Sequence, residues 1–398
     1  MTSRRRLLVP LALSLGLSGT LAAAAFFQRS RPGPAPPVAP SVEAWGGASR
    51  APFRYLATDL GALPGSPATL PRDINNAGQV VGDAERVRPP FAARFRSLVR
   101  PLGIDLDPPP RTTAFLWERG RMRRLAGLTT NTESHAFAIN DRGEVAGASE
   151  TFVDMDGALV PAMRACLWRG GGRGKPRELG TLGGPWSMAY ALNDRGQVVG
   201  VSHTAGDAET YPFLWQDGTL RRLGDEPGYA KAINDRGEVA GDAPGHLFLW
   251  SGGARRKLPG LGGENNRVGA MNDRGQIVGA ATFVPGGDPV ADLSALTAFV
   301  WDGRRARHLP ASGSAMEARD VNNHGDVVGS ATDRGGRWRA VLYRSGVLYD
   351  LQGLLPPKGD DGWLLEDAFA VNDRGQVVGV GRFGPRRERR AFLLTPTR

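Results

Sequence analysis

The stretch "AYALNDRGQVVGVS", Ala189–Ser202, carries the pattern that decides the fold. Its central phrase has the general form N-[D/N]-x-G-x-[V/I]-x-G. Seven copies occur, and they begin at Asn75, Asn140, Asn193, Asn234, Asn272, Asn322 and Asn372. A phrase that recurs so often indicates a repeat protein in which each copy belongs to one supersecondary unit.

One copy predicts a tight β-hairpin. Small and apolar residues alternate up to the asparagine, which is typical of a strand. The asparagine side chain can accept hydrogen bonds from backbone N–H groups further on, and Asp-Arg fits the centre of a type I turn. Glycine in the fourth position supplies the positive φ of a G1 bulge, and "QVVG" forms the return strand.

Two further phrases complete the unit. Each copy is followed by an apolar run such as Ala114–Trp117 ("AFLW") or Pro212–Trp215 ("PFLW"), and six of these runs lead through a short turn into a phrase of the type RxLGxLGG, clearest at Arg177. Apolar residues at consecutive positions indicate a strand that is covered on both faces. We therefore expect four short antiparallel strands per unit.

Four-stranded sheets that pack side by side around an axis cover the inner strands on both faces, so the sequence predicts an all-β, seven-bladed β-propeller. The seventh unit lacks its last strand, whereas an unassigned strand of that type lies at Phe53–Gly65. We expect this N-terminal strand to complete the last blade, with Tyr55–Leu60 pairing with Ala391–Leu394, which leaves no open edge. The alanine-rich strand before each NDRG turn is expected to be innermost. A degenerate eighth blade within Asp83–Thr113 is an alternative.

The phrases resemble the HAF repeat family of extracellular repeat proteins, whose units have the form "AINDxGQVVGxS…HAFLWxxGxMxDLGTLGG". The resemblance covers about Tyr55 to Leu394. It implies a repeat fold and export from the cytoplasm. The phrase that names the family is approximated only at His246, and the resemblance carries no reaction or site residue.

The N-terminus is typical of a targeting segment. Three arginines precede an uncharged apolar run from Leu7 to Phe27, and small residues at Ala22–Ala25 offer a cleavage site. We therefore assign residues 1–30 to a signal peptide or signal anchor, residues 31–52 to a Pro/Gly-rich linker and residues 53–398 to the propeller. The expected location is periplasmic or extracellular. If residues 7–27 stay uncleaved, they are long enough to hold the protein in a membrane.

The chain offers no recognisable catalytic or cofactor-binding motif. The single cysteine, Cys166, replaces an apolar residue in a predicted core strand, so we expect a buried, inert thiol. The five histidines lack metal-ligand spacing, and "DMDG" at Asp154–Gly157 lacks a matching carboxylate. The NDRG turns are interpreted as structural, because one turn per blade would hold their oxygens too far apart for calcium. We expect no metal, no cofactor and no catalytic residue.

Charge is concentrated in two stretches. The formal net charge is +10. Glu85–Arg111 holds six arginines and three acids, and Arg382–Arg390 holds five arginines and one glutamate. In a closed ring both stretches belong to neighbouring units and to the face opposite the NDRG turns. The candidate residues for an anionic ligand are Arg86, Arg88, Arg94, Arg96, Arg100, Arg386, Arg387, Arg389 and Arg390.

These observations favour an exported, non-enzymatic binding module that is a monomer and has an acidic ligand. That ligand could be a polysaccharide, a lipid head group or a protein surface, and export argues against nucleic acid. A carbohydrate-active lyase or hydrolase is the alternative from another class, and it needs two carboxylates that converge on the central channel. A purely structural envelope protein is the third.

Overall fold

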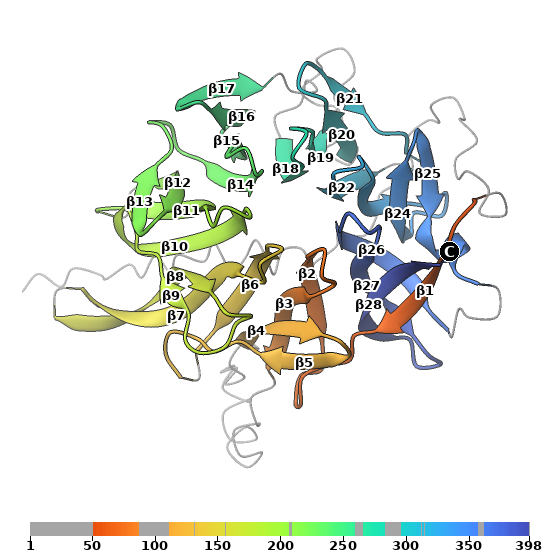
Figure 1. Cartoon of the computed structure of the whole chain (residues 1–398), viewed down its shortest axis with the longest axis horizontal. Helices are drawn as coiled ribbons and strands as arrows, with labels where there is room; N and C mark the ends of the chain where they lie inside the picture. Colours follow the sequence, from red (N-terminus) through yellow and green to blue (C-terminus); the bar gives the residue numbers. More distant parts are fainter. Residues whose placement is uncertain are drawn as a thin grey trace, which may run out of the picture. The chain divides into compact units, whose positions relative to one another are not determined.

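Seven four-stranded antiparallel sheets surround a common axis (Figure 1). The computed structural model describes residues 51–86, 111–130, 132–155, 157–206, 209–258, 266–282, 296–311, 313, 315–356 and 362–397. All of them belong to one compact unit, Pro40–Arg398. The prediction of a seven-bladed propeller is confirmed. In the part of the chain that the structure describes, no helix is long and apolar enough to cross a membrane.

Each blade runs from an innermost to an outermost strand. Blade 1 contains β2 (Thr69–Ile74), β3 (Val80–Arg86), β4 (Arg111–Glu118) and β5 (Arg121–Arg124), and blade 2 contains β6 (Ser134–Ile139), β7 (Val145–Met155), β8 (Ala158–Trp168) and β9 (Arg177–Glu178). Blade 3 contains β10 (Gly183–Leu192), β11 (Val198–Thr204), β12 (Thr210–Gln216) and β13 (Thr219–Arg222), and blade 4 contains β14 (Tyr229–Ile233), β15 (Val239–Ala243), β16 (His246–Ser251) and β17 (Ala254–Leu258).

The remaining three blades follow the same order. Blade 5 contains β18 (Asn266–Met271), β19 (Ile277–Thr282), β20 (Leu296–Trp301) and β21 (Ala306–His308). Blade 6 contains β22 (Met316–Val321), β23 (Val327–Thr332), β24 (Trp338–Arg344) and β25 (Val347–Asp350), and the short helix η4 (Leu351–Leu354) follows it. Blade 7 contains β26 (Leu364–Val371), β27 (Val377–Phe383), β28 (Glu388–Thr397) and β1 (Arg54–Asp59).

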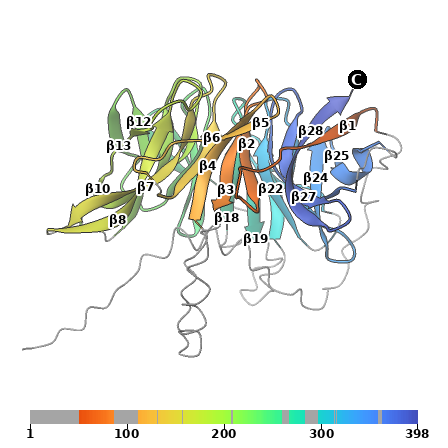
Figure 2. The same ribbon diagram turned by 90° about the horizontal axis from the view of Figure 1, so that it is seen from below.

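The two ends of the propeller meet in blade 7, where β1 runs beside β28 (Figure 2). Ala57 pairs with Leu394 and Thr58 with Leu393, and the Leu60 N–H donates to the carbonyl of Ala391 at 3.0 Å. This is the pairing predicted from the unassigned N-terminal strand. It gives the outermost edge of blade 7 a partner that the C-terminal repeat cannot supply.

A β-bulge lies in the innermost strand of every blade, three residues before the repeated asparagine. In blade 3 the register shifts between Ala189 and Ala191. The bulge brings the carbonyl oxygen of Met188 against Gly200, where a Cβ would lie only 1.9 Å from it. The last glycine of each "VVG" phrase is therefore required by close backbone approach. The glycine within the turn, such as Gly196 at φ 76°, supplies the predicted positive φ.

Apolar side chains fill the space between neighbouring blades. One buried cluster combines Leu167 of blade 2 with Val198, Phe213 and Trp215 of blade 3. The "AFLW"-type strands are buried at consecutive positions, as predicted for strands covered on both faces. Cys166 is fully buried, as predicted, and burial raises the pKa of its thiol.

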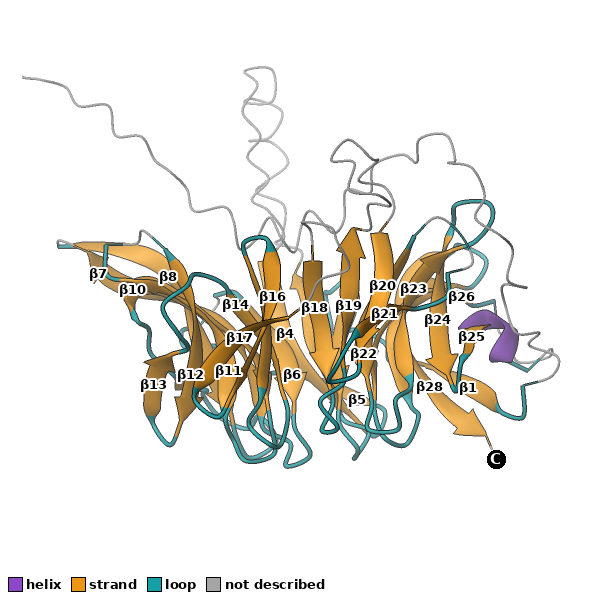
Figure 3. Cartoon of the chain, turned by 90° about the horizontal axis from the view of Figure 1, so that it is seen from above, coloured by secondary structure: helices purple, strands orange, loops and turns teal. Residues whose placement is uncertain are grey.

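Blade 2 departs from the common pattern. Its strands β7 and β8 have eleven residues each and form a hairpin that extends beyond the ends of the other blades (Figure 3). Asp154 accepts a hydrogen bond from the Gly157 N–H at 2.8 Å, so these two residues of the "DMDG" sequence contact each other at the tip of this hairpin. Phe152, Met155 and Leu159 are exposed near that tip.

Candidate functional site

The repeated asparagines form a closed ring around the axis. Each asparagine side chain donates from Nδ2 to the backbone carbonyl of the corresponding asparagine in the next blade, at 2.9–3.4 Å. Asn372 of blade 7 donates to Asn75 of blade 1 and closes the circle. Within its own turn, Asn193 also accepts from the N–H groups of Arg195 and Gln197. These buried side chains therefore use both their donors and their acceptors within the fold.

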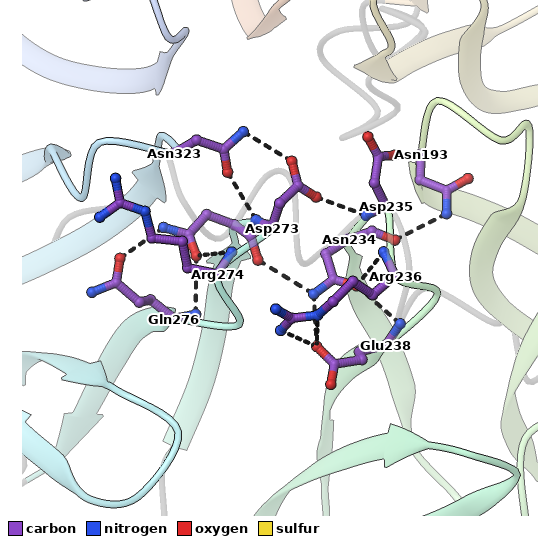
Figure 4. A network of polar contacts seen from close by, with 10 residues as sticks. Asn193, Asn234, Asp235, Arg236, Glu238, Asp273, Arg274, Gln276 and Asn323 are labelled. Atoms are coloured by element: carbon purple, nitrogen blue, oxygen red, sulfur yellow. Dashed lines mark hydrogen bonds and ion pairs between the residues drawn. The ribbon is translucent and has the colours of Figure 1, made fainter.

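A second ring is formed by the residue after each asparagine. Its backbone N–H donates to the side-chain Oδ1 of the same position in the next blade, at 2.7–2.9 Å. Figure 4 shows part of both rings: Asn193 of blade 3 donates to Asn234 of blade 4, and in the second ring Asp235 donates to Asp273 and Asp273 to Asn323 across blades 4, 5 and 6. Five members of this ring are aspartates and two are asparagines, Asn76 and Asn323.

The two rings line a cavity of about 200 Å³ at the mouth of the central channel. We call this end of the propeller the turn face, and the opposite end the loop face. The expectation that the turns lie far apart is wrong, because the innermost strands converge on the axis and bring all seven turns together. The expectation that these strands are innermost is confirmed.

Each blade contributes one aspartate to this cavity. In five blades it follows the repeated asparagine, whereas in blades 1 and 6 it lies two residues before it. Asp73 and Asp320 replace the alanine found at this position in the other blades, and the same two blades carry Asn76 and Asn323 in the second ring. The aspartate therefore occupies a different position of the repeat in blades 1 and 6, but each of the seven blades still places one aspartate at the cavity.

Asp73 and Asp320 are each held by two backbone donors. Asp73 accepts from Ile74 of its own strand at 2.7 Å and from Ile139 of blade 2 at 2.8 Å. Asp320 accepts from Val321 and from Val371 of blade 7, both at 2.8 Å. Burial raises the pKa of Asp73 to about 6. Burial, together with the charge of Asp73, raises the pKa of Asp320 to about 7, against the effect of the backbone donors.

The second ring places negatively charged aspartate side chains close to one another. Burial raises the pKa of Asp194, and the charges of Asp235 and Asp141 add to the rise, although the Asp141 N–H bond opposes it. Asn76 relieves this crowding by donating from Nδ2 to Oδ2 of Asp141 at 2.7 Å. Among the residues that the structure describes, no three His, Cys, Asp or Glu side chains form a group suited to a metal ion.

Next to the cavity along the innermost strands, the bulged residues form a belt of cations and aromatic rings. Phe137 lies 5.6 Å from Tyr190 between ring centroids, and the Lys231 ammonium lies 4.0 Å from the Tyr190 centroid. Arg72 and Arg319, which precede the two displaced aspartates, pair with Asp83 at 3.0 Å and with Asp367 at 2.9 Å. Burial favours a raised pKa of Asp83, but the charges of His135 and Arg72 outweigh it and hold the pKa below its usual value.

The loop face carries the described members of the predicted arginine group. Blades 7 and 1 are neighbours, as predicted, and the β27–β28 hairpin ends on the loop face with Arg386, Arg387 and Arg389 exposed. Arg390 pairs with Glu388 at 2.6 Å. Arg86 ends β3 at the same face of blade 1 and is half-buried. Four of the predicted arginines, Arg88, Arg94, Arg96 and Arg100, fall outside the described residues, as does most of the segment considered as an eighth blade.

No family profile and no curated protein matches the sequence, so the resemblance to the HAF repeat family stays a prediction. Solved propellers resemble the structure. A puromycin-hydrolysing peptidase from Mycobacterium tuberculosis superimposes with a TM-score of 0.50 at 14% identity, over 86% of this chain and 54% of that one. TolB from Acinetobacter baumannii gives a TM-score of 0.40 at 11% identity, over 71% and 76% of the two chains. A gluconolactonase from Xanthomonas campestris gives 0.36 at 12% identity, over 90% and 99%. This likeness extends to the fold alone.

Proposed function

We propose that this propeller is an exported binding module whose ligand is anionic and contacts the loop face of blades 7 and 1. The observation that carries the proposal is the β27–β28 hairpin. Arg382–Arg390 contains five arginines and one glutamate, and Arg386 and Arg387 make no ion pair with any described residue. Cations that are exposed, clustered and unpaired attract anions strongly.

Neutralising this hairpin tests the proposal. R386Q/R387Q/R389Q/R390Q is expected to elute from immobilised heparin at a clearly lower salt concentration than the native protein. The matched control is R142Q/R195Q/R274Q/R374Q, which removes four exposed arginines from NDRG turns on the turn face. If both variants elute together, the ligand does not use the loop face and this function is wrong.

Export is the second part of the proposal. It rests on the uncharged run Leu7–Phe27 behind three arginines. Export predicts that protein recovered from its native host lies outside the cytoplasm, with a new N-terminus after Ala22–Ala25 if the segment is cleaved. Terminal sequencing of that material decides between cleavage and anchoring, and recovery in the cytoplasm would contradict export.

Asp73 and Asp320 favour a second candidate, a carbohydrate-active hydrolase or lyase. Two carboxylates lining one cavity, with pKa values of about 6 and about 7, are suited to general acid and base roles near neutral pH. This is the convergence on the channel that the enzyme alternative requires. Both groups also have a structural role, because each bridges to the next blade through a backbone N–H. The candidate requires turnover of a polysaccharide that is lost in both D73N and D320N while the fold is retained.

A further inference from the structure

The outer edges of the blades differ strongly in charge. The outermost hairpins of blades 1, 2, 4 and 5 carry fourteen arginines and lysines and three acids, in residues 118–124, 169–178, 251–258 and 302–308. The same parts of blades 6 and 7, residues 344–350 and 54–59, each carry one cation and one acid. Protecting an edge strand against aggregation requires only some charge. Blades 6 and 7 therefore show that the excess on the other blades is not needed to protect the edge.

The junction between blades 1 and 2 concentrates this excess. The turn before β9 is "RGGGRGKP", Arg169–Pro176, whereas the corresponding turn of blade 3 is "QDG". Gly170, Gly171 and Gly172 all have positive φ, so the enlarged turn adopts a backbone that other residues rarely accept. Arg123 of β5 donates from Nη1 to the carbonyl of Gly172 at 3.0 Å and holds this turn against blade 1.

The β4–β5 hairpin of blade 1 and the enlarged turn of blade 2 contribute five cations on the two sides of this junction, which we call the rim cluster: Arg119, Arg121, Arg123, Arg173 and Lys175. Four of the five are exposed, and Arg123 is half-buried. The described residues provide none of the five with a salt bridge. Burial lowers the pKa of Arg123, and the charge of Arg173 lowers it further, so the two guanidinium groups lie close enough to repel each other.

We propose that the rim cluster binds a linear acidic polysaccharide along the outer edge of the turn face. The cluster lies on a convex edge and combines side chains from two blades, which suits a flexible chain with repeated anionic groups. The acidic cavity at the centre of the same face repels such a chain and restricts it to the edge. Single-stranded nucleic acid binds through stacked aromatic side chains as well as cations, and none of the large exposed apolar side chains in the described part of the chain lies in the cluster.

This inference goes beyond the proposed function, because the rim cluster and the β27–β28 hairpin lie on opposite faces. The test uses full-length protein and heparin oligosaccharides, with affinity measured over a series of salt concentrations. R119Q/R121Q/R173Q/K175Q is expected to weaken binding by about 30-fold near physiological salt, at about 0.5 kcal/mol per exposed contact. Its salt dependence is also expected to become shallower.

The control R142Q/R195Q/R274Q/R374Q removes the same charge from the centre of the same face, and it is expected to bind like the native protein. Equal weakening of the two variants would overturn the inference, because overall charge would then explain binding. Loss of binding in the hairpin variant alone would support the proposed function and contradict the rim site. Single-stranded DNA that binds as tightly as heparin, with the same dependence on the rim cations, would contradict the assignment to a polysaccharide.

Discussion

The centre and the edge of the turn face use polar residues in opposite ways. At the centre the first asparagine of the turn recurs in all seven blades, and side chains such as that of Asn193 make four hydrogen bonds within the protein. At the edge the letters vary between blades, and cations such as Arg121 and Lys175 have no described ion-pair partner. Polar groups that bond fully to one another hold the ring closed, whereas groups without partners remain available to a ligand.

The largest expected effect on the free energy of unfolding comes from a substitution in the asparagine ring that replaces one nitrogen by an oxygen. In N193D a carboxylate oxygen replaces the Nδ2 group, which donates to Gln197 at 2.7 Å and to the carbonyl of Asn234 at 2.9 Å. The buried carboxylate then faces two acceptors, which is expected to lower the free energy of unfolding by about 3 kcal/mol. Urea denaturation followed by circular dichroism measures the difference.

The adjacent position provides the matched control, because D194N makes the reverse exchange. Its Oδ1 still accepts from the Asp141 N–H, as Asn76 and Asn323 do in their own blades. D194N is therefore expected to change the unfolding free energy little, or to raise it by relieving the repulsion from Asp235 and Asp141. A large loss of stability in D194N, or none in N193D, would show that the two rings do not differ as the structure indicates.

A smaller change in the free energy of unfolding is expected when the pH is varied. The pKa values of Asp73 and Asp320 in the folded protein lie above the usual 3.8, at about 6 and about 7, so the folded state holds their protons more tightly than the unfolded state does. The stability from this difference is fully present below about pH 4 and is lost as pH rises through 6 and 7. The unfolding free energy is therefore expected to fall from pH 5 to pH 8, and by about 2 kcal/mol between pH 6 and pH 8.

D73N/D320N removes both titrating groups, so its stability is expected to change less over the same range. The comparison is made between the two pH profiles, because their difference isolates the contribution of the two substituted carboxyl groups. If the two profiles are parallel, the two carboxyl groups are ionised in the folded protein at pH 5 and cannot serve as the acid of a catalytic pair.

The sequence predicted the blades better than the contacts between them. The NDRG hairpin and the strand from Tyr55 are specified by residues close together in the chain, so turn type, blade number and closure could all be predicted. The ring through Asn193 and Asn234 exists only once neighbouring blades pack, and no local pattern reports its second hydrogen bond. The displaced aspartates Asp73 and Asp320 can be recognised in the sequence, where "RDINN" and "RDVNN" replace the usual "xAxND". That this exchange keeps one carboxylate per blade at the cavity follows only once both positions are known to face it.

The smallest expected effect is on the stability of the edge. Neutralising Arg119, Arg121, Arg173 and Lys175 removes cations that bond to nothing in the described structure, and it leaves Arg123 on the Gly172 carbonyl. Exposed charges contribute little to stability, and here they repel one another, so the unfolding free energy is expected to stay within about 0.5 kcal/mol or to rise. The difference is expected to shrink as salt is added, because screening weakens repulsion between exposed charges. Thermal unfolding at low and high salt measures both effects. A clear loss of stability would mean that these cations, like the asparagines at the axis, hold blades together, and the contrast between centre and edge would disappear.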